Sequence, residues 1–195
     1  MNKLGILFAF VTFLFAGCKE NQPTQFDVVK SNAEAYIKEK MNDPSSYEFV
    51  NLVLIDSTTY KDNIEYRLNL FNNRLTGAIS EVERLERYKI ELPSLYDENR
   101  LNDEKVEIQK NEKILFKIDS LANVLGNKKN EVAAYTYLFS FRGNNALGAK
   151  VLKEYITQTN PAPDFKIINM TDDKDKVFLN PNDFPGYREM IKENL

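Results

Sequence analysis

The chain lacks histidine and tryptophan and has one cysteine in 195 residues. Without histidine, Ser-His-Asp and Cys-His nucleophile systems and histidine-ligated zinc sites are excluded. One cysteine can form neither an internal disulfide nor a CxxC redox pair. No glycine-rich phosphate loop occurs either. We therefore predict a non-enzymatic protein with no cofactor and no metal site.

Charge is nearly balanced, with 26 Lys and Arg against 29 Asp and Glu and a net charge of -3. Proteins that bind nucleic acids normally carry a basic stripe, so we predict no nucleic-acid partner. A content of 43% hydrophobic and 28% charged residues is typical of a folded chain and not of a disordered one.

Residues 1–17 have the pattern of a secretory signal peptide. Lys3 precedes an uncharged apolar run, residues 4–15, that is too short to span a membrane comfortably. The run ends in LFAGC (residues 14–18), which resembles the lipobox of bacterial lipoproteins. An ordinary signal peptide with a chance cysteine is the alternative.

The lipobox resemblance implies cleavage before Cys18, a diacylglycerol on its sulfur and an acyl chain on the new amino group. Several buried acyl chains, at about 0.8 kcal/mol per CH₂, give a stable membrane anchor. Lys19 in place of Asp resembles the Gram-negative pattern for transport to the outer membrane. Residues 18–25 are then the lipidated cysteine and a short polar tether, and the localisation is a lipid-anchored position in the cell envelope.

Residues 26–195 are predicted to form one α+β domain. Apolar residues at positions 26, 29, 33, 37 and 41 predict a helix over residues 26–41, and Pro44 ends it. Aromatic and β-branched residues predict a strand over residues 47–59. The helix is expected to cover one face of the sheet.

A long helical hairpin is predicted at residues 61–126, inserted between strands 1 and 2. Two apolar seams with heptad spacing meet at a turn that contains Pro93. The first seam consists of Ile64, Leu68, Phe71, Leu75, Ala78, Val82 and Leu85. The second consists of Leu101, Ile108, Leu115, Ile118, Ala122 and Leu125, with Glu104 and Asn111 as polar members. Such an antiparallel coiled coil projects as an arm or completes a dimer; alternatively, both helices pack along the sheet.

Residues 131–142 show the clearest strand pattern, because aromatic residues alternate with small and polar ones. The turn at residues 143–147 predicts a second strand over residues 148–159, and residues 165–170 a short edge strand. Residues 183–195 are expected to form a docking helix. The predicted domain is therefore a helix packed on a curved antiparallel sheet of about four strands.

Two short segments resemble elements of uncharacterised Bacteroidota-type lipoproteins. They are DPSSYEF (residues 43–49) and FRGNNALG (residues 141–148). The resemblance implies a helix packed on a curved antiparallel sheet and carries no activity.

Candidate site residues are few. Tyr135 and Tyr137 belong to an aromatic row that lines either a core or a ligand cleft, and Arg142 at the strand end is a candidate anion clamp. Ser57 and Ser120 lie in Asp-Ser-Thr and Asp-Ser-Leu, which resemble the acceptor of O-glycosylation in Bacteroidota-type proteins.

The resulting prediction is a lipid-anchored interaction or structural protein that contacts a protein partner or a second copy through residues 61–126. Alternatives are ligand binding at the aromatic face and, less favoured, a carboxylate-based hydrolase.

Overall fold

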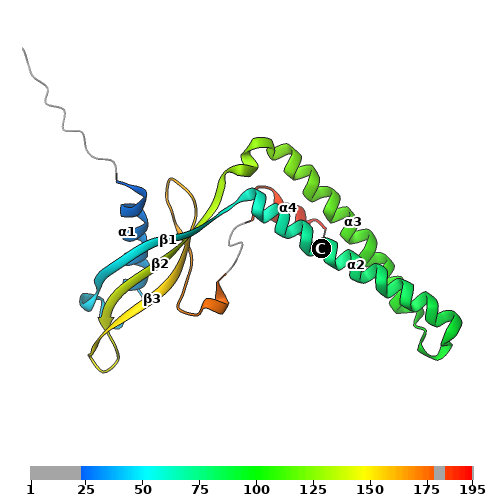
Figure 1. Ribbon diagram of the computed structural model, residues 1–195, viewed down its shortest axis with the longest axis horizontal. Coiled ribbons are helices and arrows are strands. Elements are labelled where there is room, and N and C mark those ends of the chain that lie inside the picture. Colours follow the sequence, from blue (N-terminus) through cyan, green and yellow to red (C-terminus); the bar gives the residue numbers. More distant parts are fainter. Residues whose placement is uncertain (1–22, 178–182, 195) are drawn as a thin grey trace, which may run out of the picture.

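The computed structural model describes residues 23–177 and 183–194 (Figure 1). In chain order the elements are α1 (Gln25–Lys38), β1 (Glu48–Thr59), α2 (Tyr60–Glu91), α3 (Glu98–Leu125), β2 (Val132–Asn144), β3 (Lys150–Thr159), β4 (Ile167–Thr171) and α4 (Tyr187–Lys192). The strands form one antiparallel sheet in the order β1-β2-β3-β4. The predicted α+β class is therefore confirmed, including long helical structure between strands 1 and 2.

Helix α1 begins at a capping box and buries one apolar stripe. The Thr24 side chain accepts a hydrogen bond from the Asp27 backbone N–H, and the Asp27 carboxylate accepts one from the Thr24 backbone N–H. Residues at spacings of four, Val29, Ala33 and Ile37, are buried against the sheet. These three positions of the predicted stripe are confirmed, whereas position 26 is 44% exposed and the helix ends before position 41. Helix α1 covers one face of the sheet.

Alternate residues of β2 supply most of the core beneath α1. Tyr137, Phe139 and Phe141 are 4%, 0% and 0% exposed, and the two phenylalanine rings stack with centroids 5.5 Å apart. On the neighbouring strand β1, Leu52 pairs with Phe139 in register and is also buried. The predicted aromatic row is thus core for most of its length.

The hairpin of α2 and α3 leaves the sheet without a flexible loop. Thr59 is both the last residue of β1 and the N-cap of α2, where its side chain accepts from the Asp62 backbone N–H. At the base, the Tyr60 backbone N–H donates to the Glu131 carbonyl oxygen at 3.1 Å, which ties the two ends of the hairpin together. Figure 1 shows the two helices projecting away from the sheet, as an arm does. They do not pack along the sheet.

Helix α4 docks onto the base of this hairpin. Phe184, Tyr187 and Met190 are buried together with Ile114 and Ile118 of α3. The Arg67 side chain of α2 donates two hydrogen bonds to Asp183 Oδ1, at 3.1 and 2.6 Å. The predicted C-terminal helix therefore exists, and its docking surface is the hairpin.

Candidate functional site

The seam between α2 and α3 is closed by the two helices themselves. Phe71, Ala78 and Leu85 of α2 are buried, and so are Leu101 and Ile118 of α3. These five residues belong to the predicted seams. The apolar surface that a seam-based dimer would require is therefore already occupied within one chain.

One ion pair links the two helices across the seam. Glu81 of α2 accepts hydrogen bonds from Arg84 of its own helix and forms an ion pair with Arg100 Nε of α3 at 2.9 Å. The hydrogen bond from Arg84, together with the charge of Arg100, lowers the pKa of the Glu81 carboxyl and keeps it charged. Asn111, 3% exposed in the seam, satisfies its side-chain N–H within α3, by donating to the Glu107 carbonyl oxygen at 2.6 Å.

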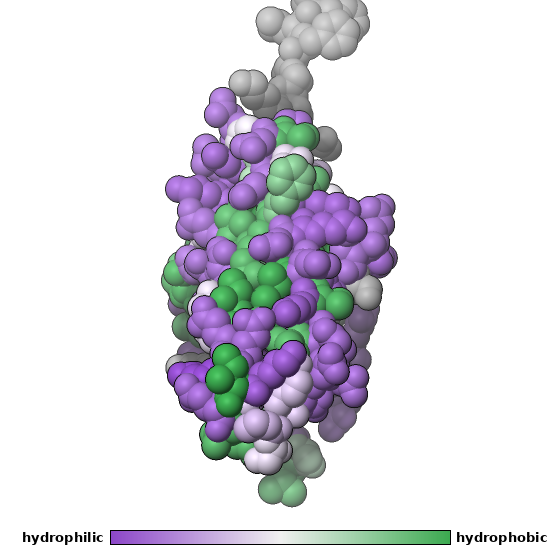
Figure 2. All heavy atoms as spheres, turned by 90° about the vertical axis from the view of Figure 1, so that its right-hand side faces the viewer, coloured by the Kyte–Doolittle hydropathy of each residue, from purple (hydrophilic) through white to green (hydrophobic). Residues whose placement is uncertain are grey.

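The far end of the hairpin exposes apolar side chains. We call residues 90–95, between the end of α2 and the start of α3, the hairpin tip. Ile90, Leu92 and Leu95 are 83%, 47% and 56% exposed. Pro93 starts a short 3₁₀ turn, and Asp97 then caps α3 by accepting from the Arg100 backbone N–H, as the turn chemistry predicted. In Figure 2, which faces this end of the molecule, apolar side chains lie between rows of hydrophilic ones.

The predicted ligand residues do not form one site. Tyr137 is buried, and its hydroxyl accepts a hydrogen bond from Gln25 Nε2 at 2.7 Å. Tyr135 is half-buried beside Tyr137, with ring centroids 6.2 Å apart. Arg142 has the opposite parity on β2, so it lies on the other face of the sheet, near Glu48. The structure therefore does not bring Arg142 to the aromatic row.

The predicted modification sites have different surroundings. Ser57 is exposed on β1, where its backbone N–H donates to Asp56 Oδ1 at 2.8 Å, and Ser120 is exposed on α3. Glycosylation at either serine stays a prediction. Cys18 and the signal segment before it lie outside the described residues.

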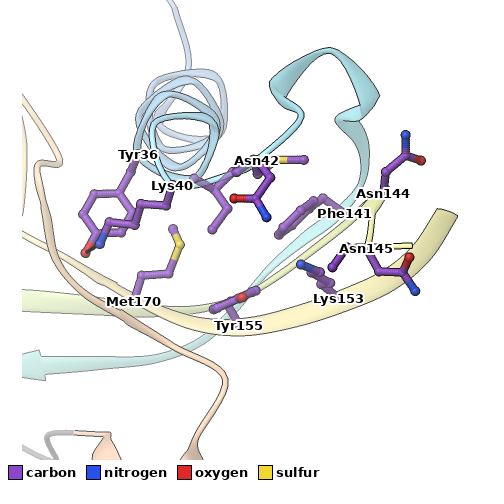
Figure 3. A pocket seen from close by; sticks show the side chains of 12 residues that line it. Tyr36, Lys40, Asn42, Phe141, Asn144, Asn145, Lys153, Tyr155 and Met170 are labelled. Atoms are coloured by element: carbon purple, nitrogen blue, oxygen red, sulfur yellow. Dashed lines mark hydrogen bonds between the residues drawn. The ribbon is translucent and has the colours of Figure 1, made fainter. Parts of the chain in front are cut away.

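A pocket lies where α1 ends above the sheet, and we call it the α1-end pocket (Figure 3). Its volume is about 200 Å³. Figure 3 shows Tyr36 and Lys40 on the α1 side, Asn42 just after the helix, and Lys153 and Tyr155 on β3 opposite. The remaining lining residues are Ile37, Met41, Phe141, Asn144, Asn145, Ala146 and Met170.

The floor of this pocket is apolar and rigid. Phe141 is fully buried and stacks on Tyr155, with ring centroids 5.9 Å apart, and on Tyr47 at 5.5 Å. Met41 closes over Gly143, where an added Cβ would lie 2.7 Å from the Met41 methyl carbon. Glycine at position 143 thus permits this close approach.

The sequence alone does not predict this pocket, because its walls come from four separate segments. Local patterns place Ile37 and Met41 on the apolar face of a helix, Phe141 on a strand and residues 144–146 in a turn, but they do not indicate that these segments meet. The one indication of the pocket in the sequence is Lys153, a charged residue that alternates with Val151 and Tyr155 on a predicted strand. That alternation places a cation on the face that α1 covers.

Five described carboxyl groups have a pKa below the ordinary value, chiefly because neighbouring side chains donate hydrogen bonds to them: Asp27, Asp43, Glu48, Asp62 and Glu81. A general acid working near neutral pH needs a raised pKa instead. These five groups are therefore suited to caps and ion pairs.

Across residues 23–177 and 183–194, no helix has both the length and the apolar character required to cross a membrane. Comparisons with protein-family models, with curated proteins and with solved structures find no match to this chain.

Proposed function

We propose that this protein is a lipid-anchored component of the bacterial cell envelope whose helical hairpin docks onto another protein through its tip. The observation that carries the proposal is the exposure of Ile90, Leu92 and Leu95 at the end of a projecting arm. Fully burying an exposed side chain of this kind is worth roughly 1.5–3 kcal/mol. A partner with an apolar groove would gain most of that free energy from Ile90 and about half of it from each of Leu92 and Leu95, which are already half-buried.

The partner favoured by the geometry is a different protein. Self-association through the seam would have to displace the packing of residues such as Phe71 and Ile118, which already fill it. The tip, in contrast, is available without any rearrangement. Charged residues surround it, including Lys89, Glu91 and Glu98, and a polar rim around an apolar centre is typical of specific interfaces.

The arm is long enough to separate the docking point from the anchored end. Helix α2 has 32 residues, which corresponds to roughly 48 Å at 1.5 Å per residue. Cys18, the proposed lipid site, precedes the first residue of α1 by 25 - 18 = 7 positions. Since α1 lies on the sheet at the other end of the molecule from the tip, the anchor leaves the tip free to reach a partner.

A site-specific cross-linking experiment tests this proposal. A photo-reactive phenylalanine analogue is placed at Leu95 in the native membrane, and a discrete adduct with one protein is expected. The triple variant Ile90→Ser, Leu92→Ser, Leu95→Ser, probed from Tyr96, should lose the adduct while keeping its helical circular dichroism, because all three side chains are exposed.

The matched control is Leu147, which is 93% exposed in the β2–β3 turn on the sheet body. The same probe there should give no adduct with that protein. Equal adducts from Leu95 and Leu147, or an adduct that survives the triple substitution, would contradict docking by the tip.

A further inference from the structure

Lys153 is a cation on the covered face of the sheet without an anionic partner. It pairs in register with Phe141, which is fully buried, and its own side chain is partly buried. Among the described residues its ammonium group makes no hydrogen bond and has no carboxylate within 4.0 Å. An unpaired ammonium group beside an apolar floor can form a charge-assisted hydrogen bond with an anion that enters the pocket. This position therefore favours an anion from outside the chain.

The whole α1-end pocket shares this charge bias. Its twelve lining residues include two lysines, Lys40 and Lys153, and no aspartate or glutamate, although acidic residues outnumber basic ones in the chain. Asp43 accepts hydrogen bonds from Ser45 at 2.6 Å and from the lining residue Asn144 at 2.8 Å. The side chains that line the pocket thus carry positive charge only, while the carboxylates of Asp43 and Asp172 lie just outside the lining.

Neutral donors lie beside the lysine. Asn42 has no hydrogen bond with the rest of the described chain, and Figure 3 shows its amide directed from the end of α1 toward the sheet. Burial, and secondarily the charge of Asp172, raise the pKa of the Tyr155 hydroxyl. Tyr155 therefore remains protonated at neutral pH and keeps a proton to donate.

The size and the floor of the pocket restrict the ligand further. A volume of about 200 Å³ is smaller than the roughly 300–1,000 Å³ of sites for drug-sized ligands. The floor of Phe141, Met41 and Met170 is apolar, and methionine side chains adapt to irregular shapes. An anion with a compact apolar group fits this combination better than a bare inorganic ion.

We propose that the α1-end pocket binds a small organic carboxylate, whose oxygens accept hydrogen bonds from Lys153 and Asn42 and whose apolar group lies on Phe141 and the two methionines. This binding site is separate from the hairpin tip and does not depend on the docking function. It also differs from the cleft expected at Tyr135, Tyr137 and Arg142, because none of those residues lines it.

Methionine-methyl NMR of the full-length protein, titrated with benzoate, tests the proposal directly. The methyl resonances of Met41 and Met170 should shift saturably, and that of Met190, buried at the hairpin base, should not. Lys153→Gln should weaken benzoate binding roughly tenfold or more, because it removes a charge-assisted hydrogen bond. Hexanoate should compete with benzoate.

Two controls separate charge recognition from general binding. Lys150→Gln removes a lysine of the same strand that pairs with Glu48 at 2.9 Å, and it should leave benzoate affinity unchanged. Benzamide, a neutral analogue, should bind the unaltered protein at least about tenfold more weakly than benzoate. Equal binding of both compounds, unchanged affinity in Lys153→Gln, binding of inorganic phosphate alone, or no saturable shift at Met41 and Met170 would each overturn the proposal.

Discussion

The sheet body and the hairpin bury their apolar residues in two separate cores. The body core joins α1 to the sheet around large rings such as Phe139 and Phe141. The hairpin core runs along α2 and α3, repeats at heptad spacing through residues such as Phe71 and Ile118, and ends at α4. Within residues 23–177 and 183–194, no buried residue belongs to both cores. The body thus concentrates its packing free energy in a few rings, whereas the hairpin spreads it along two helices.

This difference separates two kinds of surface. The body folds a helix over a sheet and leaves a pocket where the helix ends, near Lys153. The two helices of the hairpin bury the apolar side chains of the seam against each other. The apolar side chains that stay exposed lie at the tip and on the outer faces of the helices. Ligand binding is therefore expected in the body and protein docking at the arm. Substitutions that destabilise one core and leave the other intact test whether the two cores unfold independently.

The largest effect is expected from Phe139→Ala. Phe139 is fully buried at the centre of β2, and removal of such a ring costs about 3–5 kcal/mol of unfolding free energy. Urea denaturation followed by hydrogen exchange should show the loss in peptides from β2 and β3. Exchange in α3, around residues 108–118, should change little.

The matched variant for the other core is Ile114→Ala. Ile114 is 1% exposed, and the expected cost is about 2–5 kcal/mol, now in peptides from α2, α3 and α4. If either variant accelerates exchange equally in β2 and α3, the two cores form one cooperative unit and the comparison fails.

Ile114 also shows what the sequence could not provide. The heptad pattern placed Leu115 in the seam, but Ile114 is buried and Leu115 only partly so. The reason is α4, since Phe184, Tyr187 and Met190 add a third surface to the base of the hairpin. Heptad spacing describes two packed helices and carries no information about a segment about 70 positions further along the chain.

Local patterns, in contrast, predicted most of the fold. The alternation of Tyr135, Tyr137, Phe139 and Phe141 located β2 and its covered face, and Pro93 located the end of α2. Pro44 marked the end of α1 less closely, because this helix already ends at Lys38. These signals depend on neighbours within a few residues. The α1-end pocket was missed because it is formed by contacts between segments up to 134 positions apart, from Tyr36 to Met170.

A smaller effect is expected at the joint between α4 and the hairpin. Asp183→Ala removes the carboxylate that accepts both hydrogen bonds from Arg67. The two side chains are 25% and 17% exposed, so solvent screens the pair in part, and we expect a loss of about 1–2 kcal/mol. Hydrogen exchange should accelerate in residues 184–193 and stay unchanged in β2.

The control for this variant is Glu65→Ala. Glu65 pairs with Lys61 at 3.6 Å, and both side chains are more than half exposed, so its removal should cost close to zero. If Asp183→Ala is as harmless as Glu65→Ala, α4 is held by its apolar contacts alone.

The smallest expected effect concerns two equivalent helix caps, one in each region. Thr24 and Thr59 each form a capping box with an aspartate three residues later. Substitution of either threonine by alanine should cost about 1 kcal/mol. Thr24→Ala should only increase exchange at the start of α1. Thr59→Ala should also loosen the first turns of α2, because this cap joins β1 directly to the arm.

Acid provides an independent test of the cap at Thr59. Hydrogen bonds from Thr59 lower the pKa of Asp62, so the contribution of the carboxylate is present above about pH 4, the unfolded value, and is lost as pH falls through the lower folded pKa. The cost of Thr59→Ala, measured from urea midpoints by circular dichroism, should therefore be smaller at pH 2 than at pH 7. An equal cost at both pH values would mean that Asp62 contributes nothing to the joint, and that the direction of the arm is fixed by the backbone hydrogen bond from Tyr60 to Glu131 and by packing at its base.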